Sequence, residues 1–500
     1  MSQTHIANID FKNGFVWIVL LHSDGTTSIK KRRFKHFILS PERKDSLWLR
    51  LKGENFLQYI KLYDDRNREY WDDYKSLIEK FVIHNDIEAV RVLTGLTLFG
   101  ELSHKDLCVL SFDIETNGLL LNGNSLILLI SCTVRKNGRV VRKLFAYDDY
   151  PTQGAMLKAW IDWVCEISPN VICAYNGYGF DWPYISHVAK IHGIKLALGL
   201  DGSETRTATR DSYYRKEGGQ QYAYRDVKIF GREYVDVIFL VMKSDQAARQ
   251  HESYALKAVI KKLGLEREDR QHFDASRIQL VYKDPIEWAK IKQYAVHDAD
   301  DALQLFEKLI PAYFAIAKLI PKSLQQIING STGSQINSCL VSSYLQLSHS
   351  IPKASPTMQY QGGMTIAKPG LWKNTFRVDV ASLYPSICMA WNIFDPVKDP
   401  YNHFIKFLSK WTSERLEYKA LYEDTRDENA KAMSAAMKIL ANSFYGMMAA
   451  NGLNFNSPVR AAEITEHGRN ILKKAIEYTE NQGFEVFFGD TDSMAFCRKE

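Results

Sequence analysis

The chain has 500 residues, 46% of them hydrophobic, which is enough apolar material for several cores and about three to four domains. Lysine and arginine outnumber aspartate and glutamate by 64 to 58, so the balance is mildly basic and permits a polyanionic partner without requiring one. The seven cysteines contain no CxxC pair, and the longest apolar runs fall far short of the ~18 residues of a membrane span, which argues against a zinc ribbon, a disulfide framework and a transmembrane protein.

The first two thirds of the chain have the pattern of an α/β protein. Residues 1–105 alternate short apolar runs with charged turns and predict an N-terminal domain. Their first apolar run, FVWIVLL, has no basic region ahead of it, so no signal peptide is predicted. A reducing compartment is expected because the cysteine pattern supports no disulfide framework. LCVLSFDIETNG then begins a buried strand that ends at acids, and strands alternate with helical patterns to about residue 330. This alternation predicts an α/β domain over residues 106–330.

A polar segment, residues 199–232, interrupts that domain and predicts a long loop or hairpin that projects from it. It combines phosphate-binding charge with rings on which bases can stack. The residues concerned are Arg206, Arg210, Arg215, Lys216, Tyr213, Tyr214, Tyr222 and Tyr224. A solvated loop without a binding role explains this composition nearly as well.

The last third of the chain changes to an α+β pattern. Gly, Ser and Pro clusters in residues 331–375 predict a crossing segment, and FRVDVASLYPS predicts a strand that ends at an acid. Residues 414–446 predict two antiparallel helical arms that meet at DTRDEN, and FFGDTDS predicts a strand that ends at a turn. We therefore expect a multidomain protein of α/β and α+β class.

Four acids and a tyrosine form the first candidate site. Asp113 and Glu115 are two residues apart on one strand, so both carboxylates lie on the same face of it. Asp181 follows a turn-rich loop, and Tyr294 and Asp298 are four residues apart on one side of a helix. Each has an ordinary explanation when taken alone: a solvated strand end, or, for Asp298, an acidic helix face shared with the acids two and three positions on. Together they suit two Mg²⁺ ions about 4 Å apart that activate a water and stabilise the leaving oxygen of a phosphodiester.

Three further acids form the second candidate site. Asp379 ends the strand FRVDV, and Asp490 and Asp492 are expected to face the same way in FFGDTDS. Carboxylates at close range repel each other, so either one pKa rises or a cation lies between them. The turn that follows Asp379, in ASLYPS, can offer backbone N–H groups to a triphosphate.

The helix KILANSFYG lies between these acids in the sequence. Lys438, Asn442 and Tyr445 fall at i, i+4 and i+7 and share one face, which is expected to bind a nucleotide. On the preceding arm Arg415 and Lys419 are also four residues apart and can reach the outer phosphates. The ordinary alternatives are a solvated lysine at 438 and, for the other two cations, ion pairs with glutamates of the same arm.

At these residues the chain resembles the family B DNA polymerases. SFDIETNG, AYNGYGFD and YAVHD are similar to the three exonuclease motifs of that family, and YQGG at 360–363 to its Y-x-G-G linker. DVASLYPS, KILANSFYG and FGDTDS are similar to its motifs A, B and C. The resemblance implies an N-terminal domain (1–105), a 3′→5′ exonuclease domain of RNase H-like fold (106–330), a crossing segment (331–367), a palm (368–398 and 456–500) and helical fingers (399–455).

The resemblance also implies roles for the candidate residues. Asp379 and Asp492 would be the principal metal ligands of the polymerase site, with Asp490 in support. Arg415, Lys419 and Lys438 would hold the incoming triphosphate. The other members of the nucleotide site would be Ser382, Leu383, Tyr384, Asn442 and Tyr445. The exonuclease site would consist of the metal ligands Asp113, Glu115, Asp181 and Asp298, with Tyr294 as a further catalytic residue. Each site would use two Mg²⁺ ions, with Mn²⁺ able to replace them.

The implied activity is template-directed addition of dNMPs to a primer 3′ end, with proofreading. The implied partners are primer–template DNA, dNTPs and a sliding clamp, without a membrane, in the cytoplasm of a prokaryotic or phage-infected cell. One alternative is a 3′→5′ exonuclease alone, which leaves motifs A, B and C without a role. The other is a non-catalytic replisome subunit, which would be expected to have lost acids that are all present here.

Two features depart from the family pattern. Phe488 replaces the tyrosine that usually begins motif C, and no primer grip or thumb follows that motif. We therefore expect a second polypeptide to supply the thumb, with a truncated gene product as the alternative. The same reasoning predicts that Met494 and Phe496 are poorly covered.

Overall fold

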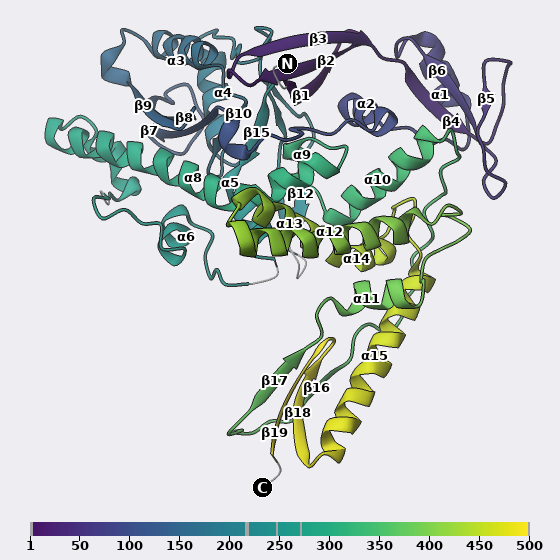
Figure 1. Ribbon diagram of the computed structural model, residues 1–500. Helices are drawn as coiled ribbons and strands as arrows, with labels where there is room; N and C mark the ends of the chain where they lie inside the picture. The colour runs from purple at the N-terminus through teal and green to yellow at the C-terminus, as the bar shows by residue number, and fades with distance from the viewer. Residues whose placement is uncertain (1–3, 216–219, 247–248, 271–272, 499–500) are drawn as a thin grey trace. The chain divides into compact units, whose positions relative to one another are not determined.

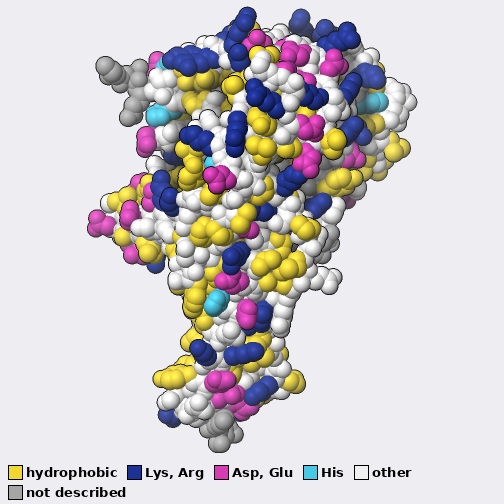
Figure 2. Space-filling view, turned by 90° about the vertical axis from the view of Figure 1, so that its right-hand side faces the viewer, with side chains coloured by type: hydrophobic (Ala, Val, Ile, Leu, Met, Phe, Trp, Pro, Cys, Tyr) yellow, Lys and Arg dark blue, Asp and Glu magenta, His cyan; other side chains and the backbone are white. Residues whose placement is uncertain are grey.

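The structure, a computed structural model, describes residues 4–215, 220–246, 249–270 and 273–498 (Figure 1). It divides into two compact units, one of residues 1–34 and 97–330 and the other of residues 35–96 and 331–500. The segment 1–105, expected to form one N-terminal domain, is thus shared between both units. Lysine and arginine side chains are spread among acidic ones over the face in Figure 2, in line with the net charge of +6. Across the described ranges, no helix is both long and apolar enough to cross a membrane.

The first unit contains a mixed sheet with the strand order β15-β10-β7-β8-β9. Its middle strands are almost entirely buried, as expected of strands covered on both faces. β7 pairs antiparallel with β8, and β8 with β9, whereas β10 and β15 run parallel to β7. The strands are β7 (Val109–Thr116), β8 (Ile127–Lys136), β9 (Arg139–Ala146), β10 (Val171–Ala174) and β15 (Glu233–Asp236). The α/β class predicted for this region is confirmed.

Helices of this unit pack on the sheet and on one another. They are α3 (Gln153–Ile167), α4 (Asp181–Ile191), α5 (Val237–Ser244), α6 (Leu256–Lys262), α7 (Ile278–Val281), α8 (Pro285–Leu319) and α9 (Leu324–Asn329). The long helix α8 starts at a proline, and the Asp284 side chain caps it by accepting the N–H groups of Ile286 and Glu287 at 2.9 and 3.0 Å.

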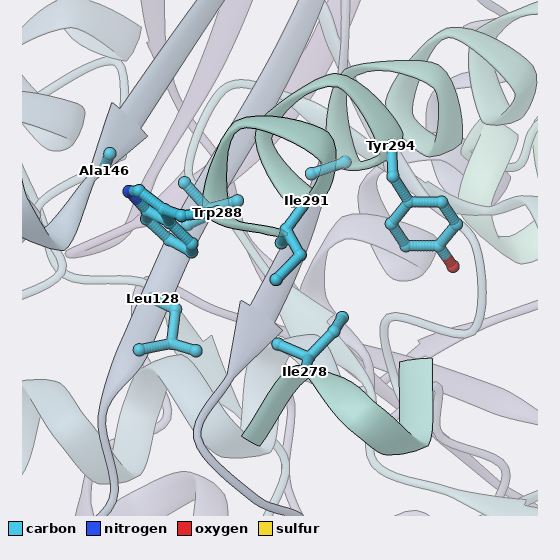
Figure 3. Packing of buried hydrophobic residues seen from close by; sticks show 8 residues of the cluster. Leu128, Ala146, Ile278, Trp288, Ile291 and Tyr294 are labelled. Carbon is cyan, nitrogen blue, oxygen red and sulfur yellow. The ribbon is translucent and has the colours of Figure 1, made fainter. Parts of the chain in front are cut away.

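The inner face of α8 packs against the sheet. Trp288, Ile291 and Tyr294 belong to one buried cluster with Leu128 on β8 and Ile278 on α7 (Figure 3). This packing sets the rotation of α8 about its axis, because a helix has one apolar face to bury. The same rotation places the acidic residues of α8 beside β7.

Two smaller elements complete the first unit. β1 (Thr4–Lys12), β2 (Phe15–His22) and β3 (Thr27–Arg33) form an antiparallel sheet in that order, so β3 is an edge strand. The polar segment 199–232 folds into paired strands, which confirms the hairpin predicted there. β11 (Arg206–Thr207) pairs with β14 (Val227–Lys228), and β12 (Ser212–Arg215) pairs with β13 (Gln221–Tyr224). Tyr214 stacks on Phe239 of α5 with ring centroids 4.6 Å apart and anchors this hairpin. Lys216 lies outside the described residues.

The second unit contains a small sheet and an antiparallel sheet of strands far apart in the sequence. The small sheet has the order β4-β6-β5, formed by β4 (His36–Ser40), β5 (Leu49–Arg50) and β6 (Tyr59–Tyr63). The other has the order β16-β18-β19-β17, formed by β16 (Thr365–Ala367), β17 (Phe376–Asp379), β18 (Phe484–Asp490) and β19 (Ser493–Arg498). The α+β pattern predicted for the last third is confirmed.

The helices of the second unit include the two predicted arms. α12 (His403–Thr425) and α13 (Glu428–Asn442) pack on each other, although α12 begins well before the predicted start near residue 414. Between them the Asp427 side chain caps α13 by accepting the N–H of Asn429 at 3.0 Å. The remaining helices are α1 (Arg68–Ser76), α2 (Asp86–Thr94), α10 (Thr332–Gln346), α11 (Leu383–Ala390), α14 (Phe444–Ala449) and α15 (Pro458–Asn481).

The prediction that Met494 and Phe496 are poorly covered was wrong. Met494 is only 9% exposed and lies in a buried cluster with Leu472 of α15. Phe496 is partly buried and packs against this cluster. The cover comes from α15, the helix that precedes these strands in the sequence. The exposed apolar side chains lie instead on the edge strand β17, where Phe376 is 56% exposed.

Candidate active sites

The first site lies where β7 meets α8. Asp113 and Glu115 project from one face of β7, as their spacing predicts, and Asp298 reaches them from α8. Each of the three offers a carboxylate oxygen, and these oxygens all lie within 4.8 Å of one another. Three carboxylates this close repel one another strongly unless a cation or protons compensate their charge.

Asp181 belongs to the same site. It is the first residue of α4, it is buried, and its Oδ1 atom lacks a hydrogen-bond partner among the described residues. Its charge is the largest neighbouring contribution to the raised pKa of Asp113, after burial itself. An unpartnered buried carboxylate oxygen is rare in folded proteins, so it indicates that a ligand completes the site.

The electrostatics of these acids point to a cation. Burial raises the pKa of Asp113 well above its usual range, with Asp181 and Glu115 adding to the effect. Burial, then repulsion from Asp298, raises the pKa of Glu115 to about 8, and burial with the nearby Asp236 raises that of Asp181 to about 8. An all-oxygen set of carboxylates is the donor set that Mg²⁺ and Mn²⁺ prefer. The residues present therefore fit the predicted metal ions.

Tyr294 lies beside Asp298 on α8, and burial with the Asp298 charge raises the pKa of its hydroxyl. Arg270 donates to Asp298 from Nη2 at 2.6 Å, which holds that carboxylate in place.

The alternative of a solvated acidic helix face around Asp298 is wrong. The two following acids are buried: Asp300 accepts from Arg142 and Arg267 at 2.9 and 2.6 Å, and Asp301 pairs with Arg270.

Sequence reasoning missed Asp236 and Lys257 at this site. Asp236 ends β15 and is fully buried, and its two oxygens accept the N–H groups of Asn176 and Tyr178, each at 2.8 Å. It thereby holds the loop that leads into Asp181. The signal was available, because EYVDV is another apolar run that ends at an acid.

Lys257 is the other residue that sequence reasoning missed. Its ammonium lies 4.5 Å from the Tyr294 ring centroid, and its positive charge partly offsets the rise in the pKa of Asp113. Nothing in the sequence spacing of Lys257 indicates this.

The second site is formed by β17 and the turn between β18 and β19. Asp379 pairs with Ser493 across β17 and β19, and this register brings Asp492 beside it. Both acids line a pocket of about 470 Å³. Burial, followed by the charge of Asp379, raises the pKa of Asp492. Two neighbouring carboxylates that line one pocket fit the predicted metal ions by the same donor chemistry.

Asp490 takes a different position from the one expected. Its Oδ1 accepts hydrogen bonds from the hydroxyls of Thr365 at 3.0 Å and Thr491 at 3.1 Å, and it does not line the pocket. Thr491, with φ of 52°, turns the chain between the two acids. The structure therefore brings Asp379 and Asp492 together and leaves Asp490 outside that pair.

Basic and polar side chains line the same pocket. They come from α12 and α13 and from the turn after Asp379: Arg415, Lys438, Asn442, Ser382, Leu383 and Tyr384. The Arg415 Nη1 donates to the Ser382 hydroxyl at 3.3 Å, which ties the helical arm to this turn. Ser382 has φ of 56°, so the backbone turns sharply before α11. Two acids and two cations thus line one pocket of about 470 Å³.

Two predicted nucleotide-binding residues lie outside this pocket. Lys419 forms an ion pair with Glu423 at 3.7 Å, and both side chains are largely exposed, as the ordinary alternative proposed. Tyr445 is not on the same helix as Lys438, because α13 ends at Asn442 and α14 begins at Phe444. Its ring packs against Tyr384 with centroids 4.6 Å apart, so it supports the pocket wall from behind.

The YQGG segment packs directly on this site. Arg469 of α15 donates to the carbonyl oxygens of Gln361 and Gly362, each at 2.7 Å. A Cβ atom at Gly363 would lie 2.5 Å from the Thr491 hydroxyl, so only glycine fits beside the turn that carries Asp492. This contact gives the second glycine of the segment a physical role.

Comparisons with known proteins agree with this geometry. A family model described as DNA polymerase family B, exonuclease domain, matches residues 94–259, and one described as DNA polymerase family B matches residues 403–499. The DNA polymerase of Desulfurococcus sp. (strain Tok) is 25% identical over 448 residues, 81% of this chain and 55% of that protein. The DNA polymerase of Archaeoglobus fulgidus is 26% identical over 365 residues, 68% of this chain and 44% of that protein.

The chain spans about half the length of the curated relatives it matches. The solved structure of the family B DNA polymerase from the hyperthermophilic archaeon Pyrobaculum calidifontis has a TM-score of 0.76 and 18% identity, covering 100% of this chain and 75% of that one. That likeness shows a shared fold. The two family models together match more than half of the chain, in the order that its motifs predict, and the chain belongs to the family B DNA polymerases.

Proposed function

We propose that this chain is a DNA-directed DNA polymerase with a 3′→5′ exonuclease. The observation that carries the proposal is the pocket that Asp379 and Asp492 line together with Arg415 and Lys438. Metal-binding acids and phosphate-binding cations in one pocket are what nucleotidyl transfer requires, since its transition state accumulates negative charge on the phosphate. The buried acids of the first unit form a separate site of the kind that hydrolyses phosphodiesters.

In the polymerase site, Asp379 and Asp492 would hold Mg²⁺ or Mn²⁺, and Asp490 would support the turn between them. Bound divalent ions would activate the primer 3′ hydroxyl and neutralise the developing charge. Arg415 and Lys438 would bind the phosphates of a dNTP. The Tyr384 ring packs against Tyr445, with centroids 4.6 Å apart, and lies so close to Gly468 that a Cβ atom added there would be 3.0 Å from it. This packing would make the ring a rigid wall under the sugar.

In the exonuclease site, Asp113, Glu115, Asp181 and Asp298 would be the metal ligands. Divalent ions held there would activate the attacking water. Tyr294 carries a buried hydroxyl next to Asp298, which suits it to orient that water or a phosphate oxygen. Primer–template DNA and dNTPs are the proposed substrates. The sliding clamp, the second polypeptide with a thumb and the cytoplasmic location stay predictions.

The test separates the two sites. Asp113→Ala with Glu115→Ala should abolish digestion of a 5′-labelled single strand in Mg²⁺ while primer extension continues, because each site holds its own ions. Asp379→Ala or Asp492→Ala should abolish extension and spare digestion. Asp490→Ala should be milder than either, since Asp490 lies outside the pocket.

The exposed Asp424 of α12 supplies a matched control, and Asp424→Ala should change neither activity. Extension that survives both Asp379→Ala and Asp492→Ala would refute the polymerase assignment. A wild-type chain that digests DNA but never extends a primer would favour the exonuclease-only alternative.

A further inference from the structure

The strand β17 carries a cation on the same face as the proposed metal ligand Asp379. Arg377 lies two residues before Asp379, and side chains two apart on a strand point to one face at roughly 7 Å. In the pairing with β19, Arg377 is opposite Ala495 and Asp379 is opposite Ser493. The Arg377 Nη2 donates to the Ser493 hydroxyl at 3.4 Å, so the guanidinium extends along the sheet towards the acids.

This face of the sheet is the one that α15 does not cover. Val378, which points to the other face, pairs with Met494, and Met494 belongs to the cluster that packs on α15. On the uncovered face, Phe488, Ala495 and Arg377 are paired in one row across β18, β19 and β17. The small side chain of Ala495 thus lies between a ring and an exposed cation. The row of acids begins one pair further along the strands.

Arg377 is separate from the cations of the nucleotide pocket. It is not among the residues that line this pocket with Arg415 and Lys438. Within the described ranges its hydrogen-bond partner is the Ser493 hydroxyl, and it forms no ion pair with a carboxylate. A second phosphate-binding group therefore lies next to the acids but outside the space assigned to the triphosphate.

An ordinary explanation exists for a cation beside acids, because its charge lessens their mutual repulsion. Arg377 is one of the groups that partly offset the rise in the pKa of Asp492. Such compensation is strongest in a direct ion pair, which Arg377 does not form. An exposed guanidinium instead presents a fork of N–H donors that matches two oxygens of one phosphate.

We propose that Arg377 binds the phosphate of the 3′-terminal internucleotide linkage of the primer and thereby holds the primer 3′ hydroxyl beside Asp379 and Asp492. That hydroxyl has to reach the metal ions at the acids, and the last phosphate of the primer lies one sugar unit behind it. The two-residue step of roughly 7 Å along β17 suits this separation. The inference rests on the proposed function, because it requires a primer end at these acids.

The first test measures the binding of labelled primer–template DNA to the full chain by fluorescence anisotropy in EDTA, which prevents digestion, over a range of salt concentrations. Arg377→Gln should weaken binding roughly tenfold at low salt and reduce the salt slope by about 0.9, the value for one lost phosphate contact to a duplex. Arg377→Lys should keep the slope but bind a few-fold more weakly, because it keeps the charge and loses the fork.

Arg498 supplies a matched control. It is an exposed arginine of β19 in the same sheet, and it alternates with Met494 and Phe496 on the face that α15 covers. Arg498→Gln should therefore change neither the affinity nor the salt slope. Far-ultraviolet circular dichroism of each variant checks that the fold is retained.

The second test identifies the phosphate. A methylphosphonate removes the charge of a single linkage, and it is placed in turn at each of the last three linkages of the primer. The wild-type chain should lose roughly tenfold in affinity when the terminal linkage is neutral, whereas Arg377→Gln should bind this primer and the unmodified one equally. If Arg377→Gln loses as much affinity as the wild type at the terminal linkage, the proposal is overturned and only charge compensation is left.

Kinetics separate this inference from the proposed function. In a background with Asp113→Ala and Glu115→Ala, Arg377→Gln should raise the KM for primer–template roughly tenfold and leave the KM for dNTP near the wild-type value. A wild-type chain that never extends a primer would refute the proposed function, whereas the binding experiments in EDTA would still test Arg377. Extension by the wild type together with unchanged DNA binding in Arg377→Gln would refute the inference alone.

Discussion

Replacing Asp236 with asparagine should disable the exonuclease site without removing any proposed metal ligand. The Asp236 carboxylate is fully buried and accepts the N–H groups of Asn176 and Tyr178, one on each oxygen. Burial raises its pKa to about 7 despite these hydrogen bonds, so at pH 8.5 it is ionised and accepts both. In Asp236→Asn an amide NH₂ group replaces one of these two oxygens. The backbone N–H of Asn176 or Tyr178 that donated to that oxygen then faces another donor and loses its acceptor.

The size of the effect follows from this lost acceptor. A buried N–H without a partner costs about 1–3 kcal/mol, which should appear in the free energy of unfolding of the first unit. The loop that contains Asn176 and Tyr178 leads directly into Asp181. A displacement of about 1 Å at a reacting group can lower a rate roughly 100-fold, and we expect kcat for single-strand digestion to fall by about this factor. KM should change little, because Asp236 is buried beneath the loop.

Asp399 in the second unit provides a matched control. It is also buried, and its two oxygens accept the N–H groups of His403 and Phe404 at 2.9 and 2.8 Å. Asp399→Asn should therefore cost a similar free energy of unfolding while leaving digestion intact. The assay is digestion of a labelled single strand at pH 8.5, at a temperature where both variants are folded. Equal losses of kcat in the two variants, or full activity in Asp236→Asn, would refute the positioning role.

Three further predictions concern other parts of the chain. Tyr384→Val should raise the incorporation of ribonucleotides relative to deoxyribonucleotides, measured by primer extension, since it removes the wall under the sugar; an unchanged ratio would favour simple core packing. The β12–β13 hairpin resembles, in position, the hairpin that helps family B polymerases part primer from template. Deleting it should therefore slow digestion of duplex ends more than of single strands, and an equal loss on both would exclude a strand-separating role. Burial lowers the pKa of His104 to about 4, so between pH 6.5 and 4 the unfolded chain binds a proton that the folded chain does not. The free energy of unfolding should fall by about 3 kcal/mol as the pH drops from 6.5 to 4. Urea titrations should show a smaller decrease for His104→Gln.

The sequence alone was sufficient for features that depend on one element at a time. Asp113 and Glu115 share a face of β7, and Lys438 and Asn442 share a face of α13, because the repeat of a strand or helix sets where its side chains point. The same local periodicity predicted the α/β and α+β regions and the two helical arms, and the polar composition of residues 199–232 predicted a loop or hairpin there. These features were confirmed.

Only the tertiary structure decided which elements meet and which side chains they bury together. Asp236 supports the Asp181 loop, and Arg270 holds Asp298, through contacts between elements that no local spacing relates. The turn at Thr491 separates Asp490 from Asp492, and α15 covers Met494, which the sequence pattern left exposed. The physical reason is that burial raises the free-energy cost of leaving a charge or polar group unpaired. Buried groups therefore need partners, and the packing of distant segments decides which partners they meet. Periodicity sets only the direction in which each side chain points.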